Sequence, residues 1–236
     1  MKIEDANMKN FISISDIISL CNMSCGFLSI ISSINNNFEL AALLMIFAIM
    51  FDSVDGWVAR KTNRQDTFGF GKNIDSLSDT VSFGVAPAIF VYSTINATST
   101  IIQPVVIIVS LLIVICGILR LTRYNITADK INTKDFIGFP IPGIAFILST
   151  FYLSGLYNEY LALILSVIIS LIMISTIIYP KFDNMPILAI SVILIVLLIL
   201  PFKIILFNIN IPALLLLLFC LYYLLINLIK HYVKIN

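Results

Sequence analysis

The sequence has few charged residues, few cysteines and almost no histidine. Charged residues fill 11% of its 236 positions and hydrophobic residues fill 60%, with a mean hydropathy of +1.05. Soluble domains carry about 25% charged residues, so a soluble fold and any function that needs a large aqueous domain are excluded. The net charge of +1 gives no indication of nucleic-acid binding. One histidine, His231 near the chain end, excludes a histidine-based triad or metal site.

Long apolar runs dominate what remains and predict an all-α integral membrane protein. A helix needs about 20 apolar residues to cross a bilayer, and a helix satisfies its own backbone groups in lipid. Asparagines, prolines and charged residues separate the runs, as expected for turns. We therefore expect a polytopic bundle of about eight transmembrane helices that forms one domain over residues 1–236. The predicted spans are Phe11–Ile34, Phe38–Ala59, Ile74–Ile95, Thr98–Leu121, Gly138–Leu156, Tyr160–Ile178, Pro186–Leu206 and Ile211–Tyr232.

The basic residues predict how this bundle is oriented. Eight spans place both termini on one side, and 13 of the 14 Lys and Arg residues then fall on that side, with Lys203 opposite. Basic residues are enriched in cytoplasmic loops. We therefore expect a multi-pass protein of the plasma membrane whose termini are cytoplasmic.

Four aspartates at the ends of two spans are the candidate site. Asp52 and Asp55 lie three residues apart near the end of the second span, and Asp75 and Asp79 lie four apart at the start of the third. Each spacing places a pair on one helix face, and the short connection makes the two helices antiparallel neighbours. All-carboxylate ligands suit Mg²⁺ or Mn²⁺, and two such ions would balance four charges. The alternative is an ion-paired helix rim built with Arg60 and nearby lysines.

The run that holds these aspartates resembles the signature of the CDP-alcohol phosphotransferases, D-x2-D-G-x2-A-R-x8-G-x3-D-x3-D. These membrane enzymes move a phosphatidyl-type group from a CDP-linked lipid to an alcohol. Ten residues separate Arg60 from Gly71 where the family has eight or nine, which leaves open whether Gly69 shares the glycine's role. The matched residues are Asp52, Asp55, Gly56, Ala59, Arg60, Gly71, Asp75 and Asp79.

The resemblance implies a role for each matched residue. Asp52, Asp55 and Asp75 would hold the metal ions, with Asp79 also near them and serving as general base. The CDP-lipid would lie along Gly56, Ala59, Arg60 and Gly71.

Four further stretches resemble the phosphatidylserine synthase branch of this family, including its archaeal archaetidylserine counterparts. With the signature they cover most of residues 11–145, which we expect to be the catalytic core, followed by C-terminal helices over 146–236. The resemblance implies CDP-diacylglycerol or CDP-archaeol and L-serine as substrates, CMP as a product, and a homodimer. The stretches are NMSCGFLSI, IDSLSDTVSFGVAPA, ILRLTRYN and FIGFPIPG.

Three polar residues within the spans have open roles. Arg120 and Arg123 share a helix face at a span end and are predicted to bind the serine carboxylate or a lipid-linked phosphate. The alternative for both is contact with anionic headgroups. Asn22 of the first span either faces the site or ties helices together.

Two other functions are alternatives. The same chemistry with glycerol 3-phosphate as acceptor would need a larger basic pocket than Arg120 and Arg123 provide. A cation transporter also uses intramembrane carboxylates, but transporter sites lie near the bilayer midplane between inverted repeats. The sequence shows no internal repeat, and its four aspartates cluster toward one surface.

Overall fold

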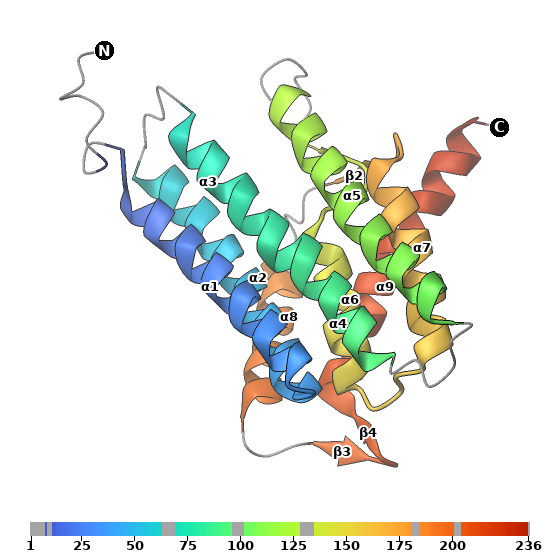
Figure 1. The fold of residues 1–236 in the computed structure, drawn as a ribbon. Helices are drawn as coiled ribbons and strands as arrows, with labels where there is room; N and C mark the ends of the chain where they lie inside the picture. Colours follow the sequence, from blue (N-terminus) through green and yellow to red (C-terminus); the bar gives the residue numbers. More distant parts are fainter. Residues whose placement is uncertain are drawn as a thin grey trace.

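The computed structural model describes residue 8 and residues 11–62, 69–95, 102–127, 135–180, 185–200 and 204–235. Within these ranges the chain forms eight helical rods that lie side by side (Figure 1). The third rod is continuous but contains a π-helix, η3. The rods are α1 (Ile14–Ile34), α2 (Phe38–Lys61), α3 (Phe70–Asp79) with η3 (Thr80–Val85) and α4 (Ala86–Thr94), α5 (Gln103–Thr127), α6 (Pro142–Leu153), α7 (Glu159–Ile174), α8 (Met185–Ile199) and α9 (Ile211–Ile235).

These rods confirm the predicted all-α membrane bundle. By length and composition, four of the described helices can cross a membrane: Ile14–Ile34, Phe70–Thr94, Gln103–Thr127 and Ile211–Val233. Shorter apolar helices cover Pro142–Leu153, Glu159–Ile174 and Ala189–Ile199. The predicted count of eight spans is therefore approximate.

Several predicted spans are shorter as helices than their apolar runs; helix α7, for example, ends at Ile174 although the run Tyr160–Ile178 continues beyond it. The run from Gly138 yields helix only from Pro142, because Gly138 has a positive φ of 79° and follows strand β1 (Phe136–Ile137). Helix α8 ends at Ile199, although the apolar run continues to Leu206. The last two residues of that run, Ile205 and Leu206, form strand β3.

Two short antiparallel strand pairs lie outside the helices. β1 pairs with β2 (Ile178–Tyr179), and β3 (Ile205–Leu206) pairs with β4 (Ile209–Asn210). Figure 1 shows the start of α1 and the end of α9 at one end of the bundle and the β3–β4 pair at the other. Of the basic residues used to predict orientation, Lys2, Lys9, Arg64, Lys130, Lys134, Lys181 and Lys203 lie outside the described residues.

Helix α1 buries its polar face and exposes its apolar one. Large apolar residues such as Phe27 and Ile17 are exposed, as expected for a helix surrounded by lipid. Small inward residues allow close approach of neighbouring helices, and Ser29 Oγ donates a hydrogen bond to the Ala41 carbonyl of α2 at 2.8 Å. The buried residues of α1 are Ser15, Asp16, Ser19, Asn22, Gly26, Ser29, Ser32 and Ser33.

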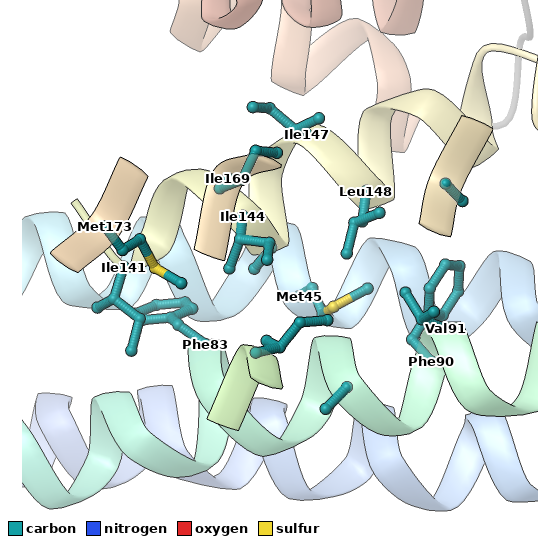
Figure 2. Packing of buried hydrophobic residues seen from close by; sticks show 14 of the residues in the cluster. Met45, Phe83, Phe90, Val91, Ile141, Ile144, Ile147, Leu148, Ile169 and Met173 are labelled. Carbon is teal, nitrogen blue, oxygen red and sulfur yellow. The ribbon is translucent and has the colours of Figure 1, made fainter. Parts of the chain in front are cut away.

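The apolar core lies between α2, the α3–α4 rod, α6 and α7. Figure 2 shows Phe83, Ile141 and Met173 grouped together, with Met45 and Ile144 packed beside them. All five side chains are fully buried. This core fixes α2 against the third rod, and these two elements carry the four aspartates.

Candidate active site

Three aspartates from two helices converge at the interface of α2 and α3. Asp52, Asp55 and Asp75 each present one carboxylate oxygen, and these oxygens lie within 4.8 Å of one another. Asp55 is buried, whereas Asp52 and Asp75 are half-buried and so remain accessible. Three hard oxygen ligands on two fixed helices fit a divalent cation of the Mg²⁺ class.

Asp79 lies one turn further along α3, beside this group of three. Its side chain interacts with Asp52, and its Oδ1 accepts a hydrogen bond from Asn22 Nδ2 at 3.1 Å. Only 6% of Asp79 is exposed. The carboxylate is therefore close to the ligand group but is held by a residue from another helix.

Helix α1 supplies the hydrogen bonds that hold two of the aspartates. Ser19 Oγ donates to Asp55 Oδ2 at 2.6 Å, one turn before Asn22. Asn22 was a candidate from its position in the first span, whereas the role of Ser19 was not predicted. The available signal was the polar spacing of Ser15, Ser19 and Asn22 in an otherwise apolar helix, which places all three on one face.

Arg120 of α5 faces the site and is almost completely buried. Its electrostatic partners include Asp79 and Asp52, and only 6% of the residue is exposed. The guanidinium carbon lies 5.4 Å from the ring centre of Tyr124 and 5.6 Å from that of Phe136. Among the described residues Nε has no hydrogen-bond partner, so this arginine retains a donor.

Arg123 makes different contacts although it lies less than one turn away. Its guanidinium donates hydrogen bonds of 2.8 to 2.9 Å to three backbone carbonyls, those of Ile137, Met173 and Ile174. A Cβ on Gly138 would lie 2.5 Å from Arg123 Nη2, so the glycine leaves room for the guanidinium. Arg123 therefore ties the end of α7 to β1.

The other signature residues line α2 and the start of α3. A Cβ on Gly56 would meet Arg60 Nη1 at 3.3 Å, so the glycine gives this guanidinium space. Ala59 is half-buried and Arg60 is exposed, both near the end of α2. Gly69 precedes α3 with a positive φ of 69°, whereas Gly71 is helical and buried. The left-handed turn into α3 thus belongs to Gly69.

These features define a membrane-embedded helical protein with a carboxylate site suited to a divalent cation. Residues 12–178 match the model of the CDP-alcohol phosphatidyltransferase family. The chain belongs to this family, which confirms the predicted enzyme class and removes support for a transporter.

The curated relatives carry more specific names. The chain is 48% identical over 181 residues to an archaetidylserine synthase of Methanothermobacter thermautotrophicus, covering 77% of this chain and 75% of the relative. It is 41% identical to a CDP-diacylglycerol–serine O-phosphatidyltransferase of Methanocaldococcus jannaschii, over 75% of this chain and 79% of the relative. The enzyme of the same name from Bacillus subtilis is 36% identical over 71% of this chain and 90% of its own length.

Proposed function

We propose that this protein transfers the phosphatidyl-type group of a CDP-linked lipid to the hydroxyl group of L-serine and releases CMP. The observation that carries this proposal is the convergence of Asp52, Asp55 and Asp75 beside Asp79, in a chain that carries the family signature. The names of the relatives support serine as the acceptor.

The three clustered carboxylates would hold Mg²⁺ or Mn²⁺, two ions per site. Bound there, the cations would neutralise charge on the pyrophosphate of the CDP-lipid. Asp79 accepts the proton of the serine hydroxyl group while the hydroxyl oxygen attacks the lipid-side phosphorus. The bond from that phosphorus to the CMP oxygen breaks, and CMP leaves with the electron pair.

Substrate binding is divided between α2, the start of α3 and α5 in this proposal. Gly56, Ala59, Arg60 and Gly71 line the CDP-lipid, where the small residues leave room for it. Arg120 binds the serine carboxylate, because it is buried beside Asp79 and its Nε donor has no partner in the part of the chain that the structure describes.

The proposal extends to the whole chain. We place the termini and the active site on the cytoplasmic side of the plasma membrane, in agreement with the distribution of basic residues. Residues 11–145 form the catalytic core, residues 146–236 form supporting helices, and two copies form a homodimer. The match of the family model to residues 12–178 supports a core in the N-terminal part of the chain.

The test is release of CMP by purified protein in detergent. CDP-diacylglycerol and CDP-archaeol are each combined with L-serine, glycerol 3-phosphate or inositol phosphate. We expect CMP release with L-serine. CMP release with glycerol 3-phosphate but not with L-serine would contradict the proposal.

Replacing the proposed base gives a sharper prediction. Asp79→Asn removes the proton acceptor but keeps the side-chain shape, so CMP release with serine should fall by at least about a hundredfold. A matched control is Glu159→Gln, which changes an exposed carboxylate at the start of α7. Near-normal turnover in folded Asp79→Asn protein would exclude Asp79 as the base.

A further inference from the structure

Asn22 has one buried hydrogen-bonding atom that the fold leaves unpaired. The residue is 0% exposed, and its Nδ2 donates to Asp79. Its Oδ1 has no hydrogen-bond partner among the described residues. A buried carbonyl oxygen without a donor is unfavourable, so a missing donor at this position requires an explanation.

The orientation of the amide follows from the chemistry of its partner. In its proposed role as general base Asp79 is ionised, and an ionised carboxylate accepts hydrogen bonds and cannot donate them. The NH₂ group of Asn22 must therefore face Asp79, and its oxygen must point elsewhere. Exchanging the two atoms would place two acceptors against each other.

The backbone holds Asn22 firmly in place. Ser82 Oγ of the π-helix donates to the Asn22 carbonyl at 3.0 Å. One turn further along α1, Gly26 packs so closely on Ser82 that an added Cβ would lie 2.5 Å from the Ser82 Cα. Asn22 is thus held through its backbone by the packing of α1 on η3, and through its side chain by the hydrogen bond to Asp79.

We propose that Asn22 Oδ1 accepts a hydrogen bond from the ammonium group of the acceptor amino acid. This inference rests on the proposed function, and it completes a three-point recognition of serine. Asp79 contacts the hydroxyl, Arg120 contacts the carboxylate and Asn22 contacts the ammonium. Arg120 interacts electrostatically with the same Asp79 that Asn22 holds, so Arg120 and Asn22 both lie beside the Asp79 carboxylate.

A neutral oxygen suits this position better than another carboxylate. Asp52, Asp55, Asp75 and Asp79 already concentrate negative charge here, and a fifth acid would compete for the metal ions. An amide oxygen binds an ammonium group without adding charge. It also selects an amino acid over an acceptor of similar size that lacks the amino group.

The experiment compares serine with 3-hydroxypropanoate, which keeps the hydroxyl and carboxylate but lacks the ammonium group. CMP release gives the KM for serine and the inhibition constant of 3-hydroxypropanoate as its competitor. Asn22→Ala should raise the KM for serine at least about tenfold, the loss typical of a charged hydrogen bond. The inhibition constant of 3-hydroxypropanoate and the KM for the CDP-lipid should change less than threefold, because neither molecule carries the ammonium group that Asn22 is proposed to bind.

Two more variants separate recognition from packing. Asn22→Leu keeps the side-chain size and should lose discrimination as Asn22→Ala does, and either variant suffices if the other does not fold. Ser24→Ala, an exposed position on the same helix, is the control and should leave every constant unchanged.

The outcomes are distinct. An equal rise of the serine KM and the competitor's inhibition constant would overturn the inference, since Asn22 would then act only on Asp79 or on packing. Wild-type protein that does not use serine would instead refute the proposed function.

Discussion

At the scale of single residues, the proposed metal ligands depend on partners that contribute no ligand themselves. Ser19 donates a 2.6 Å hydrogen bond to Asp55 from a helix that carries none of the signature. Such outer contacts orient metal ligands and strengthen metal binding. The ligand group is therefore built from three helices, although its aspartates come from two.

Ser19→Ala should weaken metal binding. Loss of an outer hydrogen bond reduces metal affinity by about tenfold or more, so the Mg²⁺ or Mn²⁺ concentration for half-maximal CMP release should rise by about tenfold. Saturating metal should restore most of the turnover. The control is Ser24→Ala, whose hydroxyl bonds to the carbonyl of Leu20 on the exposed face. Unchanged metal dependence in Ser19→Ala would show that the hydrogen bond from α1 to Asp55 does not strengthen metal binding.

The two arginines on α5 show how neighbouring residues of one type take different roles. Shared spacing predicted a shared function for Arg120 and Arg123. In the structure Arg120 is buried near Asp79, whereas Arg123 donates to three backbone carbonyls. We infer that Arg123 stabilises the fold, because its hydrogen-bonding capacity is directed at the polypeptide chain.

Arg123→Ala should therefore act on stability. Removing charged donors from three carbonyls should lower the free energy of unfolding by about 2 kcal/mol, measured as a lower melting temperature in detergent. The KM for serine should stay near that of the wild type below this temperature. Arg120→Ala serves as the comparison and should raise the serine KM. A selective loss of serine affinity in Arg123→Ala would show that Arg123 binds the acceptor and would contradict a purely structural role.

At the scale of elements, the contact between α1 and η3 positions Asp79, the proposed base. Gly26 packs against Ser82, and the Ser82 hydroxyl binds the Asn22 carbonyl one turn away. Helix α1 can hold Asp79 only while this approach is preserved. Small residues at helix contacts in membranes serve this purpose generally.

Gly26→Ala tests the contact directly. The new Cβ would overlap the Ser82 backbone, so α1 and η3 must separate, and both melting temperature and turnover should fall. The separation should cost about 1 to 3 kcal/mol, as other overpacked sites do. Gly84→Ala is the matched control, because a Cβ there meets nothing within 4 Å. Equal effects of the two substitutions would argue against the close contact.

The elements differ in how well the sequence predicts them. Apolar runs located each rod because lipid requires helices. The π-helix was not predicted, because the apolar and small residues of Thr80–Val85 are equally compatible with an α-helix. The link between the end of α7 and β1 was not predicted. Arg123 makes this link by donating hydrogen bonds to backbone carbonyls, and every residue has a carbonyl, so no side-chain pattern marks its partners.

At the scale of the whole molecule, the surface is as informative as the interior. Along α5, large apolar residues such as Ile108 and Leu111 are exposed, while Arg120 is buried. This inversion of the soluble pattern is typical of a chain surrounded by lipid. Few charged residues first indicated the membrane, and the buried ones among them mark the candidate site.

The sequence predicted the family and the four aspartates because a spaced motif survives without three-dimensional information. It could not predict which helix completes the site. The partnership of Ser19 with Asp55 and of Asn22 with Asp79 depends on how α1 packs against two other rods. Such pairing joins residues 36 and 57 positions apart and has no local pattern.

The π-helix at Thr80–Val85 makes chain length a determinant of geometry. A turn with i→i+5 bonding holds one residue more than an α-helical turn. The π-turn therefore absorbs the extra residue, and deleting one residue there would restore regular α-helix while leaving Phe90 and Val91 in nearly the same phase relative to Asp75 and Asp79. Deleting one residue from an α-helical part of the rod would instead rotate everything beyond it by about 100° and turn Phe90 and Val91 away from the core. The rod should therefore tolerate a one-residue deletion within Thr80–Val85 far more readily than one within α3.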